Sequence, residues 1–245
     1  MTLDPQTVWG FPPTSWTLVR QSRGGDERVV GAALDQLCRT YWRPLYAYVR
    51  GRRLARADAE DAVQEFFATA LRRELFQRAE AGEGKLRSFL LTAMKHHLID
   101  RAAKEGAARR RPEGGWADID FSQAEAEWLR VAESGAAPDA AYERQWAKAL
   151  IAQAMVRLEA RYVAEGKREV FEALKGEALE EGESSGISNT AGAGLSAGAR
   201  RVAVHRLRKR FSEALHGVVA DTLPVDGDVE AELRELAVAL KEGKR

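Results

Sequence analysis

The chain has 245 residues, one cysteine, and 38 Lys and Arg against 37 Asp and Glu, for a formal net charge of +1. This length is enough for one or two domains with their own cores. A single cysteine excludes a disulfide framework and a cysteine-based metal site. The chain has no apolar run of roughly 20 residues, the length that spans a bilayer, and its first residues, MTLDPQTVWG, lack the basic region and apolar stretch expected of a signal peptide. We therefore expect a cytoplasmic protein with no membrane partner.

The first helical pattern runs from residue 27 to residue 49. Its apolar side chains recur at three- and four-residue steps, which predicts one buried stripe: Val30, Leu34, Leu37, Tyr41, Leu45 and Tyr48. Cys38 falls on the same face as a small core residue. Pro44 is expected to kink or break the helix near residues 41–43. Its aromatic side chains could stack on bases, but their spacing favours the core.

A second helix is predicted over residues 58–71, with Asp58 at its N-terminal cap. The residues facing inward are Val63, Phe66, Phe67 and Ala70. The outer face is acidic and polar and carries Glu60, Asp61, Gln64 and Glu65. Such a face is either solvated or a docking surface.

The third helix, residues 85–111, is strongly basic. It holds eight Lys and Arg residues against Asp100 and Glu105, while an apolar stripe follows its other side. A helix that is apolar on one side and basic on the other suits a polyanion. A solvated surface helix with a basic C-terminal end is the alternative reading.

The remainder is predicted to be a linker over 112–138, with a short helix near 122–131, followed by further helices. A second basic stretch at 200–210 has six basic residues and no acid. The tail carries an acidic helix at 229–240. This helix could bind an inhibitor, mask the basic faces or be solvated, and we expect it to be solvated. Because no strand pattern occurs, the predicted fold is all-α, with two small helical domains joined by an acidic linker.

An enzyme is not expected. The chain lacks HEXXH, GxSxG, GxxxxGK[ST] and GxGxxG motifs, and its four histidines show no metal-ligand spacing. The carboxylates of Glu60, Asp61 and Glu65 are close in sequence, but nothing near them indicates a substrate pocket. We therefore expect no catalysis, no cofactor and no metal.

Three segments together resemble a known family: YWRPLYAYVR, DAEDAVQEFF and LRSFLLTAMKHHLID, at residues 41–50, 58–67 and 86–100. In this order and spacing they resemble domain two of bacterial sigma-70-type RNA polymerase subunits of the extracytoplasmic-function (ECF) group. VAVHRLRKRF, at 202–211, resembles the end of sigma domain four, a helix-turn-helix. The opening FPPTSWTLV and the long linker resemble a planctomycete-like ECF subgroup.

This resemblance implies a sigma factor that binds bacterial core RNA polymerase and promoter DNA, with an anti-sigma factor or other regulator as a further partner. Residues 15–111 would be the sigma domain 2-like unit and 112–138 the linker. Residues 139–218 would be the sigma domain 4-like helix-turn-helix, and 219–245 an acidic tail.

The resemblance also implies a role for individual residues. The expected polymerase contacts are Asp58, Asp61, Gln64, Glu65 and Phe66. The expected contacts to the downstream promoter element, with its unpaired bases, are Lys85, Arg87, Lys95, His96, Arg101, Lys104, Arg109, Arg110 and Arg111. The expected upstream-element contacts are Arg201, His205, Arg206, Arg208 and Lys209.

The chain departs from the family pattern at several positions. His96 stands where an asparagine is common, and Asn189, Ala193 and Arg200 stand at expected apolar core positions. Interior glycines, each costing about 1 kcal/mol relative to alanine, weaken the first helix of the helix-turn-helix. We therefore expect weak upstream reading. The alternatives are a stand-alone helix-turn-helix DNA- or RNA-binding regulator, a degenerate sigma relative that binds polymerase without upstream reading, and a helical bundle with charged faces.

Overall fold

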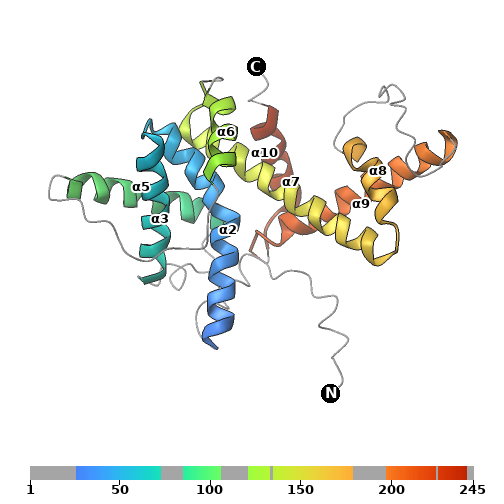
Figure 1. Ribbon diagram of the computed structural model, residues 1–245, viewed down its shortest axis with the longest axis horizontal. Helices are drawn as coiled ribbons and strands as arrows, with labels where there is room; N and C mark the ends of the chain where they lie inside the picture. Colours follow the sequence, from blue (N-terminus) through green and yellow to red (C-terminus); the bar gives the residue numbers. More distant parts are fainter. Residues whose placement is uncertain are drawn as a thin grey trace. The chain divides into compact units, whose positions relative to one another are not determined.

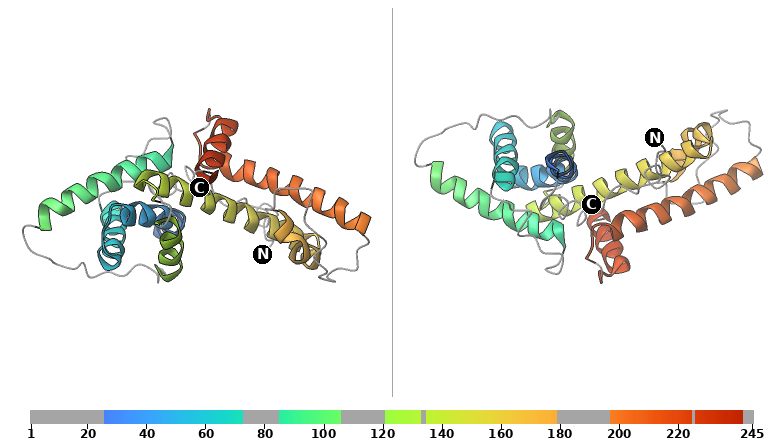
Figure 2. Two further views of the ribbon diagram at one scale, coloured as in Figure 1. Left: turned by 90° about the horizontal axis from the view of Figure 1, so that it is seen from above. Right: turned by 90° about the horizontal axis from the view of Figure 1, so that it is seen from below.

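Figure 1 and Figure 2 show the computed structural model of this chain, which describes residues 26–72, 85–105, 121–132, 135–178, 197–224 and 226–241. The described residues form helices joined by turns, with no strand among them, so the fold is all-α, as predicted. The chain divides into two compact units. Residues 1–149 with 220–245 form the first, and residues 150–219 form the second.

α2 (Glu27–Gly51) is the helix around which the first unit packs. The Asp26 carboxylate caps it by accepting a hydrogen bond from the Arg28 N–H at 2.8 Å. Cys38 is buried as expected, and burial raises the pKa of its thiol to about 12. Pro44 lies inside the helix and does not end it. An interior proline costs about 3 kcal/mol, and this cost is outweighed by side chains that are buried on both sides of it: Leu37, Tyr41, Leu45 and Tyr48.

α3 (Arg56–Arg72) and α5 (Leu86–Glu105) pack against α2 and against each other. Their apolar residues recur at helical spacing and are buried: Val63, Phe66, Phe67, Leu86, Leu90 and Met94. Both helices therefore present one face to a shared core. Residues 106–111, at the basic end expected for α5, lie outside the described residues.

α6 (Phe121–Ala132) forms inside the segment predicted as a linker. The short helix itself was expected, but it also packs on α2, so residues 121–132 belong to the first unit. The ring of Phe121 meets Trp42 at 5.2 Å in an edge-on arrangement. Trp128 and Val131 share a buried cluster with Ala47 of α2. These apolar side chains give α6 a face that is stable only against another helix.

α7 (Pro138–Ala164) also begins inside the first unit. Trp146 is fully buried, and its ring stacks on Tyr41 at 4.8 Å and 14° between planes. Gly51 lets the start of α7 approach closely, because a Cβ there would lie 2.9 Å from the Cα of Pro138. The expected second domain at 139–218 therefore differs from the compact unit, because the first turns of α7 bury their aromatic side chains in the first core.

α10 (Val229–Lys241) is the acidic helix of the tail, and the Asp228 carboxylate caps it by accepting from the Ala231 N–H at 2.9 Å. It was expected to be solvated. Instead, Glu232 and Leu236 are buried, so one of its faces packs in the first unit.

The second unit contains the end of α7, α8 (Arg168–Ala178) and most of α9 (Ala197–Ala220). Gly166, at φ +69, forms the turn after α7 in a conformation that favours glycine. The core consists of buried apolar and aromatic side chains at helical spacing: Leu158, Tyr162, Phe171, Leu174, Val204 and Leu207. The expected first helix of the helix-turn-helix falls on residues outside the described ranges.

Candidate polymerase and nucleic-acid interfaces

The outer face of α3 carries the residues expected to contact polymerase. Gln64 is exposed, and Asp58 and Asp61 are partly exposed. Phe66 differs from the expectation, because it is only 3% exposed and its ring packs against Phe67 and His97. In this structure Phe66 holds α3 to the core and is not part of its surface.

Glu65 connects α3 to α5 across the core edge. Its Oε2 accepts a hydrogen bond from Arg101 Nη1 at 3.1 Å and lies 4.0 Å from His97 Nε2. The Arg101 side chain, expected on DNA, is therefore held against a carboxylate of the neighbouring helix. Glu65 is only partly available to a partner for the same reason.

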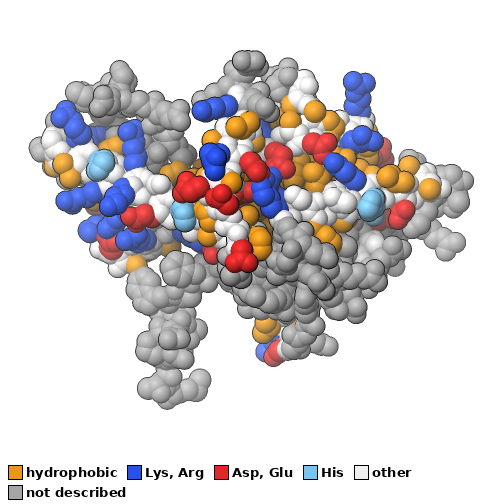
Figure 3. Space-filling view, turned by 180° about the vertical axis from the view of Figure 1, so that it is seen from behind, with side chains coloured by type: hydrophobic (Ala, Val, Ile, Leu, Met, Phe, Trp, Pro, Cys, Tyr) orange, Lys and Arg blue, Asp and Glu red, His pale blue; other side chains and the backbone are white. Residues whose placement is uncertain are grey.

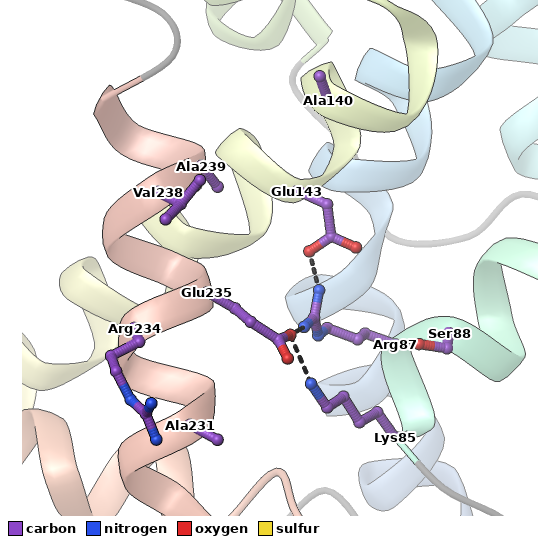
Figure 4. Close-up of a pocket in the computed structure, with 10 residues that line it drawn as sticks. All are labelled: Lys85, Arg87, Ser88, Ala140, Glu143, Ala231, Arg234, Glu235, Val238 and Ala239. Carbon is purple, nitrogen blue, oxygen red and sulfur yellow. Dashed lines mark hydrogen bonds and ion pairs between the residues drawn. The ribbon is translucent and has the colours of Figure 1, made fainter.

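The basic side chains at the start of α5 are held by glutamates from two other helices. Arg87 is 6% exposed and pairs with Glu143 of α7 and with Glu232 and Glu235 of α10. Lys85 Nζ lies 2.6 Å from Glu232 Oε2 and 2.5 Å from Glu235 Oε2. Figure 4 shows Lys85 and Arg87 pointing toward Glu235, with Glu143 meeting Arg87 from α7. We call these five residues the clasp.

The charges of the clasp stabilise one another. Hydrogen bonding from Lys85, with further contributions from Arg87, lowers the pKa of Glu235. The backbone of Arg87 is fixed too, because its carbonyl accepts a hydrogen bond from the Tyr142 hydroxyl at 2.8 Å. Arg87 was expected to contact DNA, and here its buried guanidinium is occupied by carboxylates.

The sequence interpretation missed the glutamates of the clasp. Glu232 and Leu236 are four residues apart and share the inward face of α10, which is the available sequence signal. A glutamate on an apolar stripe is normally exposed unless a cation reaches it. That cation is Arg87, which lies 145 residues earlier in the chain.

The middle of α5 leaves one expected DNA contact open. His96 is exposed, whereas Lys95 Nζ pairs with Asp139 at 2.6 Å and lies over the Tyr48 ring. The side chain of Lys104 lies outside the described residues, as do Arg109, Arg110 and Arg111.

A second buried charge cluster joins α6 to α2. Glu125 accepts hydrogen bonds from Arg50 Nη2 at 2.7 Å, from Arg50 Nε at 2.9 Å and from the Tyr46 hydroxyl at 2.5 Å. The Arg50 hydrogen bonds hold the pKa of Glu125 below its usual value of 4.5. Burial and the bond to Glu125 raise the pKa of Tyr46.

The stretch that contains most of α2, all of α3 and all of α5 can be compared with known families. Residues 37–108 match the Sigma-70 region 2 family. The chain therefore carries a sigma-70 region 2, formed by helices that share one core. The match covers well under half of the chain. No curated protein and no solved structure matches the chain.

Outside region 2, α9 of the second unit carries the other expected DNA contacts. Arg201, His205, Arg206 and Lys209 are exposed, and Arg208 is partly buried. Lys and Arg side chains gather on the α9 surface at the left of Figure 3. Arg210 is used differently, because it pairs with Glu165 at 2.9 Å and lies over the Tyr162 ring.

Among the described residues, no helix is both long and apolar enough to cross a membrane. In the same ranges no cluster of three or more His, Cys, Asp or Glu side chains could hold a metal ion.

Proposed function

We propose that this chain is a sigma factor that binds bacterial core RNA polymerase and directs promoter-specific transcription initiation, with no catalysis of its own. The observation that carries the proposal is the region 2 match at 37–108, which coincides with the packed helices α2, α3 and α5. A chance sequence match would not be expected to fall on helices that share a single core.

Each proposed surface has a physical basis. The polar face of α3, with Asp61 and Gln64, would contact the polymerase. The α5 helix would hold unpaired promoter bases, since a surface with cationic side chains suits the backbone of a single strand. The exposed cations of α9 would contact the upstream element through phosphates and base edges. Membership of the ECF group and of its planctomycete-like subgroup belongs to the same proposal.

The first experiment asks whether the purified chain co-elutes with bacterial core polymerase on a sizing column. Asp61→Lys should abolish co-elution, because it reverses a charge on the outer face of α3 without changing a buried side chain. Glu169→Lys reverses an exposed charge on α8 and should leave co-elution intact. Absence of wild-type co-elution would favour the stand-alone regulator, and equal behaviour of the two variants would reject the α3 surface.

A second experiment tests the α9 surface on duplex DNA. Replacing both Arg201 and Arg206 by Gln should weaken binding and reduce the slope of log affinity against log salt by about 2, one for each lost phosphate contact. The matched control replaces Arg168 and Lys175 of α8 by Gln, which removes the same charge. An unchanged salt slope would favour the degenerate sigma relative, which lacks upstream reading.

A further inference from the structure

The start of α5 is covered by another part of the same chain. Glu232 and Glu235 of α10 place carboxylate oxygens 2.5–2.9 Å from cationic nitrogens of Lys85 and Arg87. A phosphate diester presents two anionic oxygens to an arginine in much the same way as a carboxylate does. The acidic face of α10 thus occupies the positions that a nucleic-acid backbone would take on these two cations.

The attachment of α10 combines ion pairs with limited apolar burial. Its buried residues are Glu232 and Leu236, and Val238 is 54% exposed. Leu236 is thus the one apolar side chain of α10 that is buried. Beside the contact lies an open groove of about 760 Å³, lined in part by Ser88, Ala140 and Ala239 (Figure 4). The ion pairs of this partly exposed contact are weakened by salt, and a competing polyanion can replace them.

Arg87 would not be left unpaired if α10 moved away. Glu143 of α7 contacts Arg87 independently of α10, and the Tyr142 hydroxyl holds the Arg87 backbone. Lys85 is different, because it forms its ion pairs with two glutamates of α10. Release of α10 therefore removes both of these glutamates from Lys85 and opens part of the Arg87 guanidinium, while Glu143 and Tyr142 still hold Arg87.

We infer that α10 is an internal mimic of a nucleic-acid backbone, which masks Lys85 and Arg87 and is displaced when α5 binds single-stranded DNA. The inference rests on the proposed function, whose downstream-element surface includes these two residues. With a mask of this kind, the apparent DNA affinity equals the intrinsic affinity multiplied by the fraction of molecules in which α10 is released. Weakening α10 should therefore tighten DNA binding without adding any new contact.

The test compares two neutral variants of α10 in the full-length chain. Glu235→Gln removes a clasp carboxylate, and Glu230→Gln removes the same charge from an exposed position outside the clasp. Each is titrated with a fluorescent single-stranded oligonucleotide of mixed sequence at low salt, in the absence of polymerase. Glu235→Gln should bind about fivefold more tightly than wild type, and Glu230→Gln within about twofold.

Hydrogen exchange supplies a second measurement. Adding the oligonucleotide to wild-type protein should speed exchange of the amides of α10 while those of α2 stay protected. Equal affinities for the two variants, no binding by either, or unchanged exchange in α10 would overturn the mask. These readouts contain no polymerase, so failure to co-elute with polymerase counts against the proposed function and not against the mask.

Discussion

The two compact units hold their helices together with different chemistry. In the first, α6 and α10 each contribute a buried glutamate that pairs with an arginine of region 2. Glu125 of α6 pairs with Arg50 of α2, and Glu232 of α10 pairs with Arg87 of α5. In the second, the core is apolar and aromatic, and its ion pairs, such as Arg210–Glu165, lie nearer the surface. Breaking a buried ion pair is costly because it leaves a buried charge without its partner. These pairs therefore fix which face of α6 and of α10 packs against the first core. The second unit leaves α9 cations exposed.

The largest expected effect is in the core of the first unit. Trp146→Ala should lower the free energy of unfolding by about 4 kcal/mol, because it removes a fully buried ring stacked on Tyr41. Urea unfolding followed by circular dichroism measures this loss. Val29→Ala, at an exposed position of α2, should change stability by less than about 0.5 kcal/mol. Similar costs for the two variants would contradict the assigned core.

Truncating an aromatic side chain in the smaller core of the second unit should lower the free energy of unfolding somewhat less. Phe171→Ala should cost about 3 kcal/mol, since the ring is buried against Tyr162 but sits in a small cluster that can partly collapse. Hydrogen exchange should become faster in α8 and α9 and stay slow in α2 and α3. Loss of protection in all four helices would mean that the two units do not unfold separately.

Replacing the buried carboxylate of Glu125 in the first unit should give the next largest loss of stability. Glu125→Gln should cost about 2 kcal/mol at neutral pH, because a hydrogen-bonded carboxylate beside Arg50 becomes a neutral amide. The folded pKa of Glu125 lies below 4.5, so its contribution is present above that pH and lost as the pH falls through the folded pKa. Wild type and variant should therefore converge in acid. A constant difference across the pH range would reject this assignment.

The smallest effect belongs to the surface charge of the second unit. Hydrogen bonds from Arg210 and Lys167 lower the pKa of Glu165 to about 2, so its contribution disappears as the pH falls from 4.5 toward that value. Glu165→Gln should remove this acid dependence from the exchange of α8 and α9. In wild type, about 0.5 M salt should weaken it, because exposed charges are screened. The Glu125 dependence should survive the same salt.

The helices could be predicted from the sequence where their apolar side chains recur at helical spacing. The stripes through Leu37 and Tyr41 in α2, through Trp146 in α7 and through Leu207 in α9 recur at helical spacing and are buried. The spacing does not show which other helix each apolar stripe packs against, however. It could not show that the first turns of α7 enter the first core, or that packing keeps α2 continuous through Pro44.

The buried charges could not be predicted for a physical reason. From the sequence, Glu125 and Glu232 would be predicted to be solvated, because a buried glutamate is stable only when a cationic side chain pairs with it. Those cations, Arg50 and Arg87, lie 75 and 145 residues earlier in the chain. At the candidate site, helical position placed Gln64 on the outer face of the second predicted helix, where it is exposed, whereas the burial of Arg87 follows from α7 and α10.

The long separation within the clasp also sets an order of events during synthesis. Glu235 follows Lys85 by 150 residues. At about 5–20 residues per second, a ribosome needs on the order of 10 s to make that stretch. The helices of region 2 can pack during this interval, before α10 exists. A newly made chain therefore passes through a period in which Lys85 is present without its two α10 glutamates, and the synthesis and packing of α10 end that period.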